Sequence, residues 1–208
     1  MYRIRISPAE ERPESIVRFR QEICRVIGLD GSGPDAQPLD FATYLFVERD
    51  HVQVGMIELF FYDQCFGTYG DAPYARAADL SALAPMRELA HVGSVIVDPP
   101  YRGTRAFLFL TAAMVLAAHR MGARYLTAAT GAANHEILAF YRNAGMTPLG
   151  RFNNDGASFA LSSLDVGSRA YQAAAILERH GIALDSDALQ ALRERTSTER
   201  AERALASV

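Results

Sequence analysis

The sequence of 208 residues has little of several features that define common protein classes. Two cysteines, Cys24 and Cys65, are too few for a disulfide scaffold, and both lie in apolar segments, as small buried thiols do. The formal net charge of -3 gives no overall field that would attract nucleic acid or anionic lipid. The sequence therefore predicts neither a disulfide-stapled domain nor a nucleic-acid-binding protein.

Membrane, metal and nucleotide signatures are also missing. The longest uncharged apolar stretch runs from Ala106 to Ala118, whereas a bilayer-spanning helix needs about 20 apolar residues. The first residues have no apolar core of the signal-peptide type, so we expect a cytoplasmic protein with no membrane span. The five histidines are scattered without metal-ligand spacing, and no Walker-type or dinucleotide glycine pattern occurs, so we expect no metal.

What is present is globular composition. Half of the residues are hydrophobic and 22% are charged, which suits one ordinary domain or one domain with an appendage. From about Val166 the sequence becomes charged and rich in alanine, and it predicts peripheral helices. We therefore expect a domain over residues 1–165 and a C-terminal helical extension over 166–208.

Hydrophobic periodicity gives the order of the elements. An acidic, turn-rich loop is expected at Asp30–Asp40, after a helix that ends at Gly28. The order β-α-β-β-β-α-β-α-β-β, followed by helices, is typical of a mixed α/β fold with a partly antiparallel sheet. Strands are predicted at Tyr2–Ile6, Ala42–Val47, Val52–Tyr62, His91–Val97, Arg124–Ala129, Thr147–Phe152 and Ser158–Leu164, and helices at Ser15–Ile27, Phe107–His119 and Asn134–Asn143.

One candidate binding segment is VIVDPPYRGTRAF, from Val95 to Phe107. A strand stops at a proline pair, a basic turn with one glycine follows, and an apolar helix begins. The unpaired N–H groups and the dipole at a helix start favour phosphate, and Arg102 and Arg105 would add charge-assisted hydrogen bonds. An ordinary strand-to-helix connection with solvated arginines is the alternative.

A second segment, NHEILAFYRNAGM, runs from Asn134 to Met146. Asn134 is placed to cap a helix. Tyr141 falls on the same helix face as Ile137 and Leu138, so it is expected to point with the core-facing residues. A half-buried tyrosine that only packs is the alternative to a functional one.

In order along the chain, the two segments resemble the motifs of the GNAT acyltransferase superfamily, V-x-P-x-[YF]-R-[GR]-x-G-x-G and N-x6-Y-x3-G-[FM]. The first motif departs at Arg105 and Phe107, where the family has glycine. The resemblance implies a mixed, mostly antiparallel sheet that is splayed at its central strand and flanked by helices. The matching positions are Val97, Pro99, Arg102, Gly103, Asn134, Tyr141, Gly145 and Met146.

The resemblance also implies a donor site. Acyl-CoA or acetyl-CoA would be the co-substrate, with the backbone of Val95 and Val97 at the thioester carbonyl and Asn134 at the edge of the site. Side chains at Arg105 and Phe107 occupy places where the backbone should approach the pyrophosphate closely. Either the loop is looser, or an acyl carrier protein presents the phosphopantetheine arm. The wrapping loop would be Arg102, Gly103, Thr104, Arg105, Ala106 and Phe107.

A weaker resemblance links the N-terminal half to N-acyl amino acid synthases and acyl-homoserine lactone synthases. It rests on Arg18-Phe19-Arg20, on the acidic loop ending at Asp40, and on the hairpin residues Val54 to Ile57. It departs at Glu58, where those proteins have arginine, and over His91–Ser94, where they have Glu-x-x-Arg. It implies long-chain acyl donors and an amine acceptor, with an amino acid as one candidate.

The expected reaction is aminolysis of a thioester, in which the amine must lose a proton. His91, Glu58 and Glu88 are candidate bases, and a packing or surface role is the alternative for each. By resemblance, Tyr141 protonates the leaving thiolate.

Other functions stay open at this point. These are a small-molecule N-acetyltransferase that uses acetyl-CoA, a non-catalytic acyl-CoA or lipid-binding module on the same fold, and a structural subunit assembled through its C-terminal helices. A homodimer is a further possibility.

Overall fold

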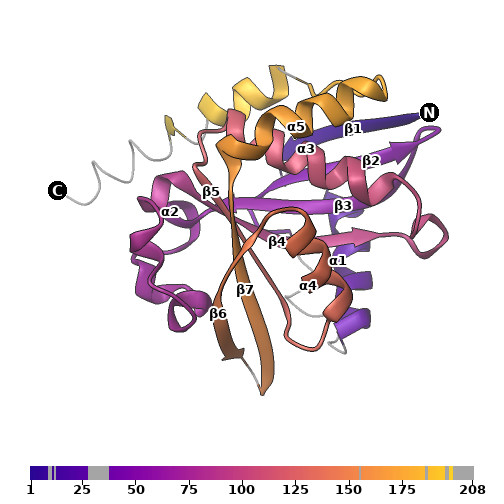
Figure 1. Cartoon of the computed structure of the whole chain (residues 1–208). Helices are drawn as coiled ribbons and strands as arrows, with labels where there is room; N and C mark the ends of the chain where they lie inside the picture. The colour runs from indigo at the N-terminus through magenta and orange to yellow at the C-terminus, as the bar shows by residue number, and fades with distance from the viewer. Residues whose placement is uncertain are drawn as a thin grey trace.

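The structure, a computed structural model, describes residues 1–8, 11, 13–27, 38–154, 156–185, 187–194 and 197–198. Within these residues, seven strands form one sheet in the order β1-β2-β3-β4-β5-β7-β6 (Figure 1). Neighbouring strands are antiparallel except β4 and β5, which are parallel. The strands are β1 (Tyr2–Pro8), β2 (Thr43–Arg49), β3 (Val52–Phe61), β4 (Leu89–Val97), β5 (Tyr125–Gly131), β6 (Thr147–Asn154) and β7 (Ala157–Asp165).

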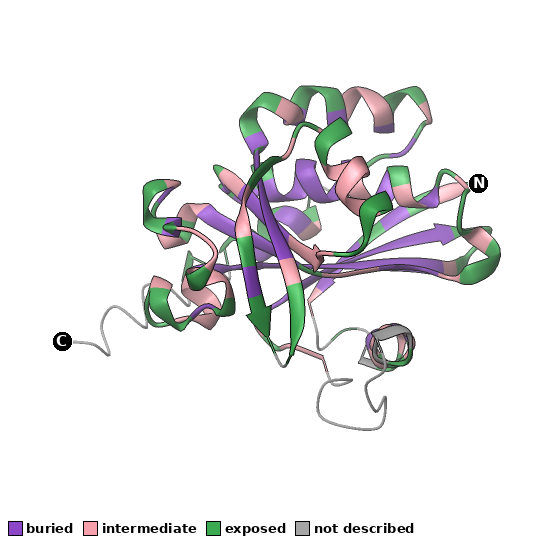
Figure 2. Ribbon diagram, turned by 60° about the horizontal axis from the view of Figure 1, so that its bottom comes forward, coloured by how far each residue is buried: buried purple, intermediate pink, exposed green. Residues whose placement is uncertain are grey.

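Helices cover both faces of this sheet (Figures 1 and 2). Helix α1 (Pro13–Ile27) packs on one face, where Ile16 and Phe19 join a core cluster with β2 and β3. Helix α3 (Ala106–Arg120) packs on the other face within the main core cluster. The short helix α2 (Tyr62–Cys65) and a run of single helical turns lie over β5 and β7, in a third cluster.

Helix α3 is apolar on nearly every side because it is covered twice. It lies between the sheet and α5 (Val166–Arg179), and both contacts bury its side chains. Val166, Ala173 and Leu177 of α5 belong to the main core cluster. The prediction that this segment is peripheral is therefore wrong for α5, which closes the core over α3. The division of the chain at residue 165 stays a prediction.

The predicted order of strands and helices is confirmed, and the fold is mixed α/β with a mostly antiparallel sheet. The predicted strand up to Tyr62 stops at Phe61 instead, because α2 begins there. Helix α4 (His135–Asn143) follows its Asn134 cap as expected. The predicted helix end at Gly28 and the loop up to residue 37 lie outside the described residues, as do the turn residue 155 and residues 199–208.

Candidate active site

The central feature of the sheet is a gap between β4 and β5. The two parallel strands pair only from Leu89 to Val92 with Tyr125 to Ala128. Beyond Val92 they part, so the edge of β4 that faces β5 has no strand partner there. The sheet is thus splayed at its central strand, as the sequence resemblance implied.

A bulge in β4 begins where the strands part. Ile57 pairs with Val95, and Leu59 pairs with Val92. Two residues of β4, Gly93 and Ser94, therefore stand opposite one residue of β3, Glu58. A β-carbon at Gly93 would lie 2.8 Å from a carboxylate oxygen of Glu58, so this position has no room for a side chain. Bulges of this kind redirect backbone groups next to functional sites.

Two backbone donors of β4 face the gap. The N–H of Asp98 donates to the carbonyl of Val54 in β3 at 2.9 Å. Because successive N–H groups alternate between the two edges of a strand, the N–H groups of Val97 and Val95 point away from β3 and toward β5. These are the two backbone groups that the sequence placed at the thioester carbonyl.

The loop from β4 to α3 presents further backbone donors. Gly103 has φ of 77°, a left-handed conformation that favours glycine. The N–H of Ala106 donates to Thr104 Oγ1 at 3.3 Å, and those of Phe107 and Leu108 have no partner among the described residues. This helix start therefore keeps the donors that suit a phosphate.

The side chains of this loop are already engaged. Arg102 donates from Nε to the carbonyl of Val97 at 3.0 Å, and a second guanidinium nitrogen lies 3.7 Å from Glu22 of α1. A guanidinium nitrogen of Arg105, Nη1, lies 3.4 Å from Nδ1 of His180. The Phe107 ring packs edge-on against Phe140 of α4, with centroids 4.8 Å apart.

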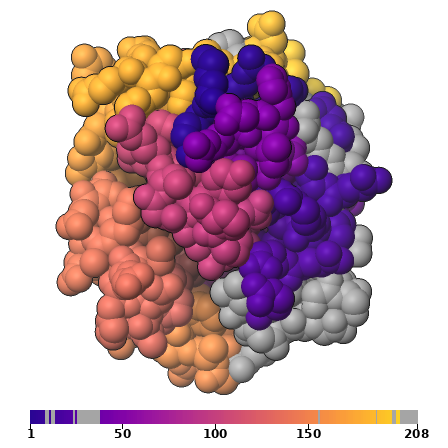
Figure 3. Space-filling model, turned by 90° about the vertical axis from the view of Figure 1, so that its right-hand side faces the viewer, coloured from indigo at the N-terminus to yellow at the C-terminus, as the bar shows by residue number. Residues whose placement is uncertain are grey.

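Figure 3 shows the loop in pink between α4 in salmon and α1 in indigo. The two side chains that replace family glycines therefore tie the loop to its neighbours. The Phe107–Phe140 contact in particular joins the start of α3 to α4.

Tyr141 lies on α4, on the same side of the sheet as this loop. The side-chain oxygen Oδ1 of Asn134 accepts a hydrogen bond from the N–H of Ile137 at 3.2 Å, so Asn134 caps α4 as predicted. Tyr141 packs half-buried against the main core cluster, and its hydroxyl has no hydrogen-bond partner among the described residues. Burial raises the pKa of Tyr141 to about 12, so the hydroxyl keeps its proton at neutral pH.

His91 faces the opposite side of the sheet, within a buried polar network. Its Nδ1 lies 2.7 Å from Oγ1 of Thr127, its partner in the pairing of β4 with β5, and the Tyr62 hydroxyl lies 2.9 Å from the same oxygen. Tyr74 stacks on the imidazole with centroids 4.2 Å apart. Burial lowers the pKa of His91 to about 3, so the ring is neutral at physiological pH and serves as a hydrogen-bonding group.

Glu58 and Glu88 have different surroundings. Glu58 is 1% exposed, faces α1, and forms an ion pair with Arg20. Glu88 lies just before β4, at the end away from the bulge, and its carboxylate is 3.7 Å from Arg87. The structure brings Glu58 against the bulge at Gly93, on the face that also holds His91, but not Glu88.

Several residues of this region were not predicted from the sequence. Thr127, Tyr62 and Tyr74 surround His91 but come from three segments without a shared motif. The large aromatic residues of this region do not gather in one place but are divided among three core clusters on both faces of the sheet. In that group are Phe60, Phe61, Tyr62, Phe66, Phe107 and Phe109.

The described residues hold neither a metal-ligand cluster nor a membrane-spanning helix. No three or more histidine, cysteine, aspartate or glutamate side chains in this part of the chain are grouped to hold a metal ion. None of the helices described is both long and apolar enough to cross a bilayer.

Sequence comparison gives the family. The model of the acetyltransferase (GNAT) family matches residues 14–146, which is well over half of the chain. The chain belongs to this family and is an acyltransferase of the GNAT type, as its motifs indicated. Comparison with curated proteins gives no match.

Solved structures share the fold. A CoA-dependent acyl-homoserine lactone synthase, BjaI, is 18% identical with a TM-score of 0.66, over 92% of this chain and 99% of its own. TofI, solved with an inhibitor and MTA, is 17% identical with a TM-score of 0.59, over 82% and 95%. An N-acetyltransferase from Staphylococcus aureus Mu50 is 15% identical with a TM-score of 0.56, over 80% and 99%.

Stability should depend on the Arg20–Glu58 pair. We expect Arg20→Met to lower the free energy of unfolding by about 3–5 kcal/mol, because it leaves a carboxylate buried without its partner. Arg25→Met, which removes one partner of an exposed pair with Glu22, is the matched control and should change little. Urea unfolding measures both, and equal effects of the two substitutions would show that the buried pair is not special.

The buried imidazole should make the protein sensitive to acid. The pKa of His91 is about 3 in the folded protein and about 6.5 in the unfolded chain, so between these values the unfolded chain binds more protons. Stability is therefore lost as the pH falls from about 6.5 toward 3. We expect His91→Gln to flatten the pH dependence of urea unfolding in this window, and an unchanged slope would contradict the assignment.

Proposed function

We propose that the protein is an N-acyltransferase that moves an acyl group from an acyl-CoA thioester to an amine. The observation that carries this proposal is the parting of β4 and β5 at the Gly93 bulge. The start of α3, with its unpaired N–H groups, and Tyr141 lie on one side of that gap, and His91 and Glu58 lie on the other. A donor and an acceptor can therefore reach one carbonyl from opposite faces.

The donor side supplies the groups that the reaction requires. The phosphate-bearing arm would bind the N–H groups at the start of α3, and the thioester carbonyl would accept hydrogen bonds from Val95 and Val97. Attack by the amine nitrogen forms the C–N bond and places negative charge on the carbonyl oxygen. When the C–S bond breaks, the thiolate takes the proton of Tyr141, whose high pKa keeps that proton available.

The acceptor side must remove a proton from the amine. The neutral imidazole of His91 and the carboxylate of Glu58 both lie on this face, and Glu58 would accept the proton directly or through water. Because burial holds the pKa of His91 near 3, its role here is to accept a hydrogen bond that orients the amine. Glu88, which lies away from the bulge, is the weakest of the three candidates.

The donor has a second form that one observation favours. Phe107 and Arg105 stand where glycines let the backbone approach a pyrophosphate, and Phe107 is packed on Phe140. An acyl carrier protein offers a phosphopantetheine arm without the nucleotide end, so this donor needs less of the loop. An amino acid acceptor follows the resemblance to N-acyl amino acid synthases. Cytoplasmic location and a homodimer stay predictions.

A thiol-release screen tests the proposal. Acetyl-CoA, octanoyl-CoA and the octanoyl carrier-protein thioester are each offered with a panel of amino acids and polyamines. We expect amine-dependent thiol release and a new amide in the mass spectrum. If CoA and carrier-protein donors of every chain length release no thiol beyond the amine-free rate, the proposed function is wrong.

A further inference from the structure

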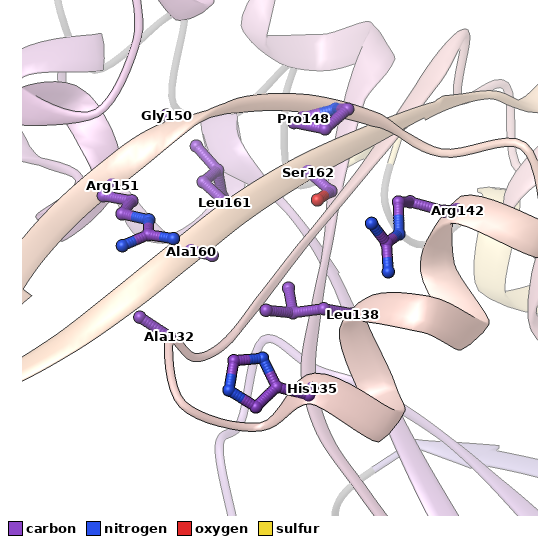
Figure 4. Close-up of a pocket in the computed structure, with 10 residues that line it drawn as sticks. All are labelled: Ala132, His135, Leu138, Arg142, Pro148, Gly150, Arg151, Ala160, Leu161 and Ser162. Atoms are coloured by element: carbon purple, nitrogen blue, oxygen red, sulfur yellow. The ribbon is translucent and has the colours of Figure 1, made fainter.

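A pocket of about 380 Å³ lies between α4 and the β6–β7 hairpin, outside the gap between β4 and β5. Four of its polar side chains come from three elements, His135 and Arg142 from α4, Arg151 from β6 and Ser162 from β7 (Figure 4). None of them takes part in the function proposed above.

The pocket exists because the sheet beneath α4 carries only small side chains. Ala128 of β5 pairs with Ser162 of β7, and Thr130 pairs with Ala160. Directly paired residues place their side chains on the same face, and Ala160 and Ser162 line the pocket. Such short side chains cannot fill the space below α4, and no residue of that helix is fully buried. The helix therefore covers a hollow instead of sealing a core.

The rim of this hollow is positively charged. The guanidinium groups of Arg142 and Arg151 have no ion-pair or hydrogen-bond partner among the described residues, and the third ionisable side chain of the lining is His135. No aspartate or glutamate lines the pocket. In a chain with net charge -3, two guanidinium groups beside one cavity without a counter-charge suit an anionic ligand.

Ser162 is a separate sign of a ligand. The residue is only 4% exposed, yet its hydroxyl has no hydrogen-bond partner in the described part of the chain. Figure 4 shows that hydroxyl directed into the hollow, on the side of Arg142 and Leu138. The hydroxyl is therefore open to the hollow and not sealed in the core, and an oxygen of a bound molecule would accept its hydrogen bond.

We propose that this pocket binds a small organic anion, a carboxylate or phosphate group on an apolar body. Arg142 and Arg151 hold the oxyanion through charge-assisted hydrogen bonds, and Ser162 donates a third. The apolar body lies against Leu138 and Pro148. The volume is near the lower end of small-molecule sites, which run from about 300 Å³, so the ligand is small, with a body of about six carbons.

Titration of the whole protein with matched probes tests the proposal. Hexanoate, hexyl phosphate and uncharged hexanol are followed by the amide chemical shifts of Leu138 and Ser162. We expect one or both anions to bind at least roughly tenfold more tightly than hexanol, and the tighter anion identifies the head group. Arg142→Ala and Arg151→Ala should each weaken anion binding roughly tenfold or more, whereas Arg179→Ala on exposed α5 should not.

A second kind of variant tests the shape of the pocket without removing a charge. Ser162→Val places an apolar side chain in the hollow and removes its hydroxyl, and we expect it to abolish binding of all three probes. Hexanol binding equal to that of both anions, or anion affinities unchanged in both arginine variants, would overturn the proposal. The readout needs no turnover, so its result is separate from that of the thiol-release screen.

Discussion

Replacing Tyr141 with phenylalanine is expected to lower kcat by roughly 10²- to 10⁴-fold, the range that general acid catalysis contributes. The substitution removes only the hydroxyl, which has no hydrogen-bond partner among the described residues, so packing of α4 should be unchanged. The KM for the thioester should change little, because the hydroxyl acts on the leaving thiolate. Steady-state thiol release with the best donor and amine from the screen measures both constants.

The pH profile gives this prediction a second readout. Because burial raises the pKa of Tyr141 to about 12, the hydroxyl stays protonated throughout the usual assay range. The rate of the wild-type protein should therefore show no loss of an essential acid up to about pH 10. Tyr171→Phe is the matched control, since Tyr171 is 87% exposed on α5. A Tyr141→Phe protein as fast as this control would remove Tyr141 from the mechanism.

Gly93→Ala is expected to lower kcat/KM on the order of a hundredfold, the cost of a misplacement of about 1 Å. The new β-carbon would lie 2.8 Å from a carboxylate oxygen of Glu58 and 3.0 Å from the Phe60 ring. Glu58 cannot yield freely because its carboxylate is paired with Arg20. The bulge must shift instead, and the N–H groups of β4 shift with it.

The same substitution should cost about 1–3 kcal/mol of stability, as overpacking does in well-packed regions. Gly167→Ala is the control, because its β-carbon would meet only ordinary contacts near the start of α5. Thiol release and urea unfolding are measured on both variants. A Gly93→Ala protein with full activity would show that the bulge does not set the geometry of the carbonyl site.

Local sequence signals predicted most of the fold, because hydrophobic periodicity is a local property. The apolar run at α3 predicted a buried helix, and Asn134 predicted the start of α4. The error at α5 has a physical cause. The alanine-rich face of α5 gives only a weak hydrophobic signal when its sequence is considered alone. Helix α3, however, is apolar on both sides, and α5 buries the side that faces away from the sheet.

The candidate site was predictable where it lies within motifs, as at Val95, Val97 and Tyr141. The network around His91 was not, because Tyr62, Tyr74 and Thr127 meet only through the pairing of β4 with β5 and the turns above it. Burial likewise decided that His91 is held neutral, and burial depends on tertiary packing that periodicity does not report.

The direct test of the central claim is the amide spectrum of the protein during titration with a non-hydrolysable analogue of acetyl-CoA. The backbone N–H groups of Val95 and Val97 should shift together with those of Phe107 and Leu108, because one ligand spans the gap and the start of α3. Shifts confined to other parts of the sheet, or shifts at the α3 start without any at β4, would contradict a thioester bound at the parting of these strands.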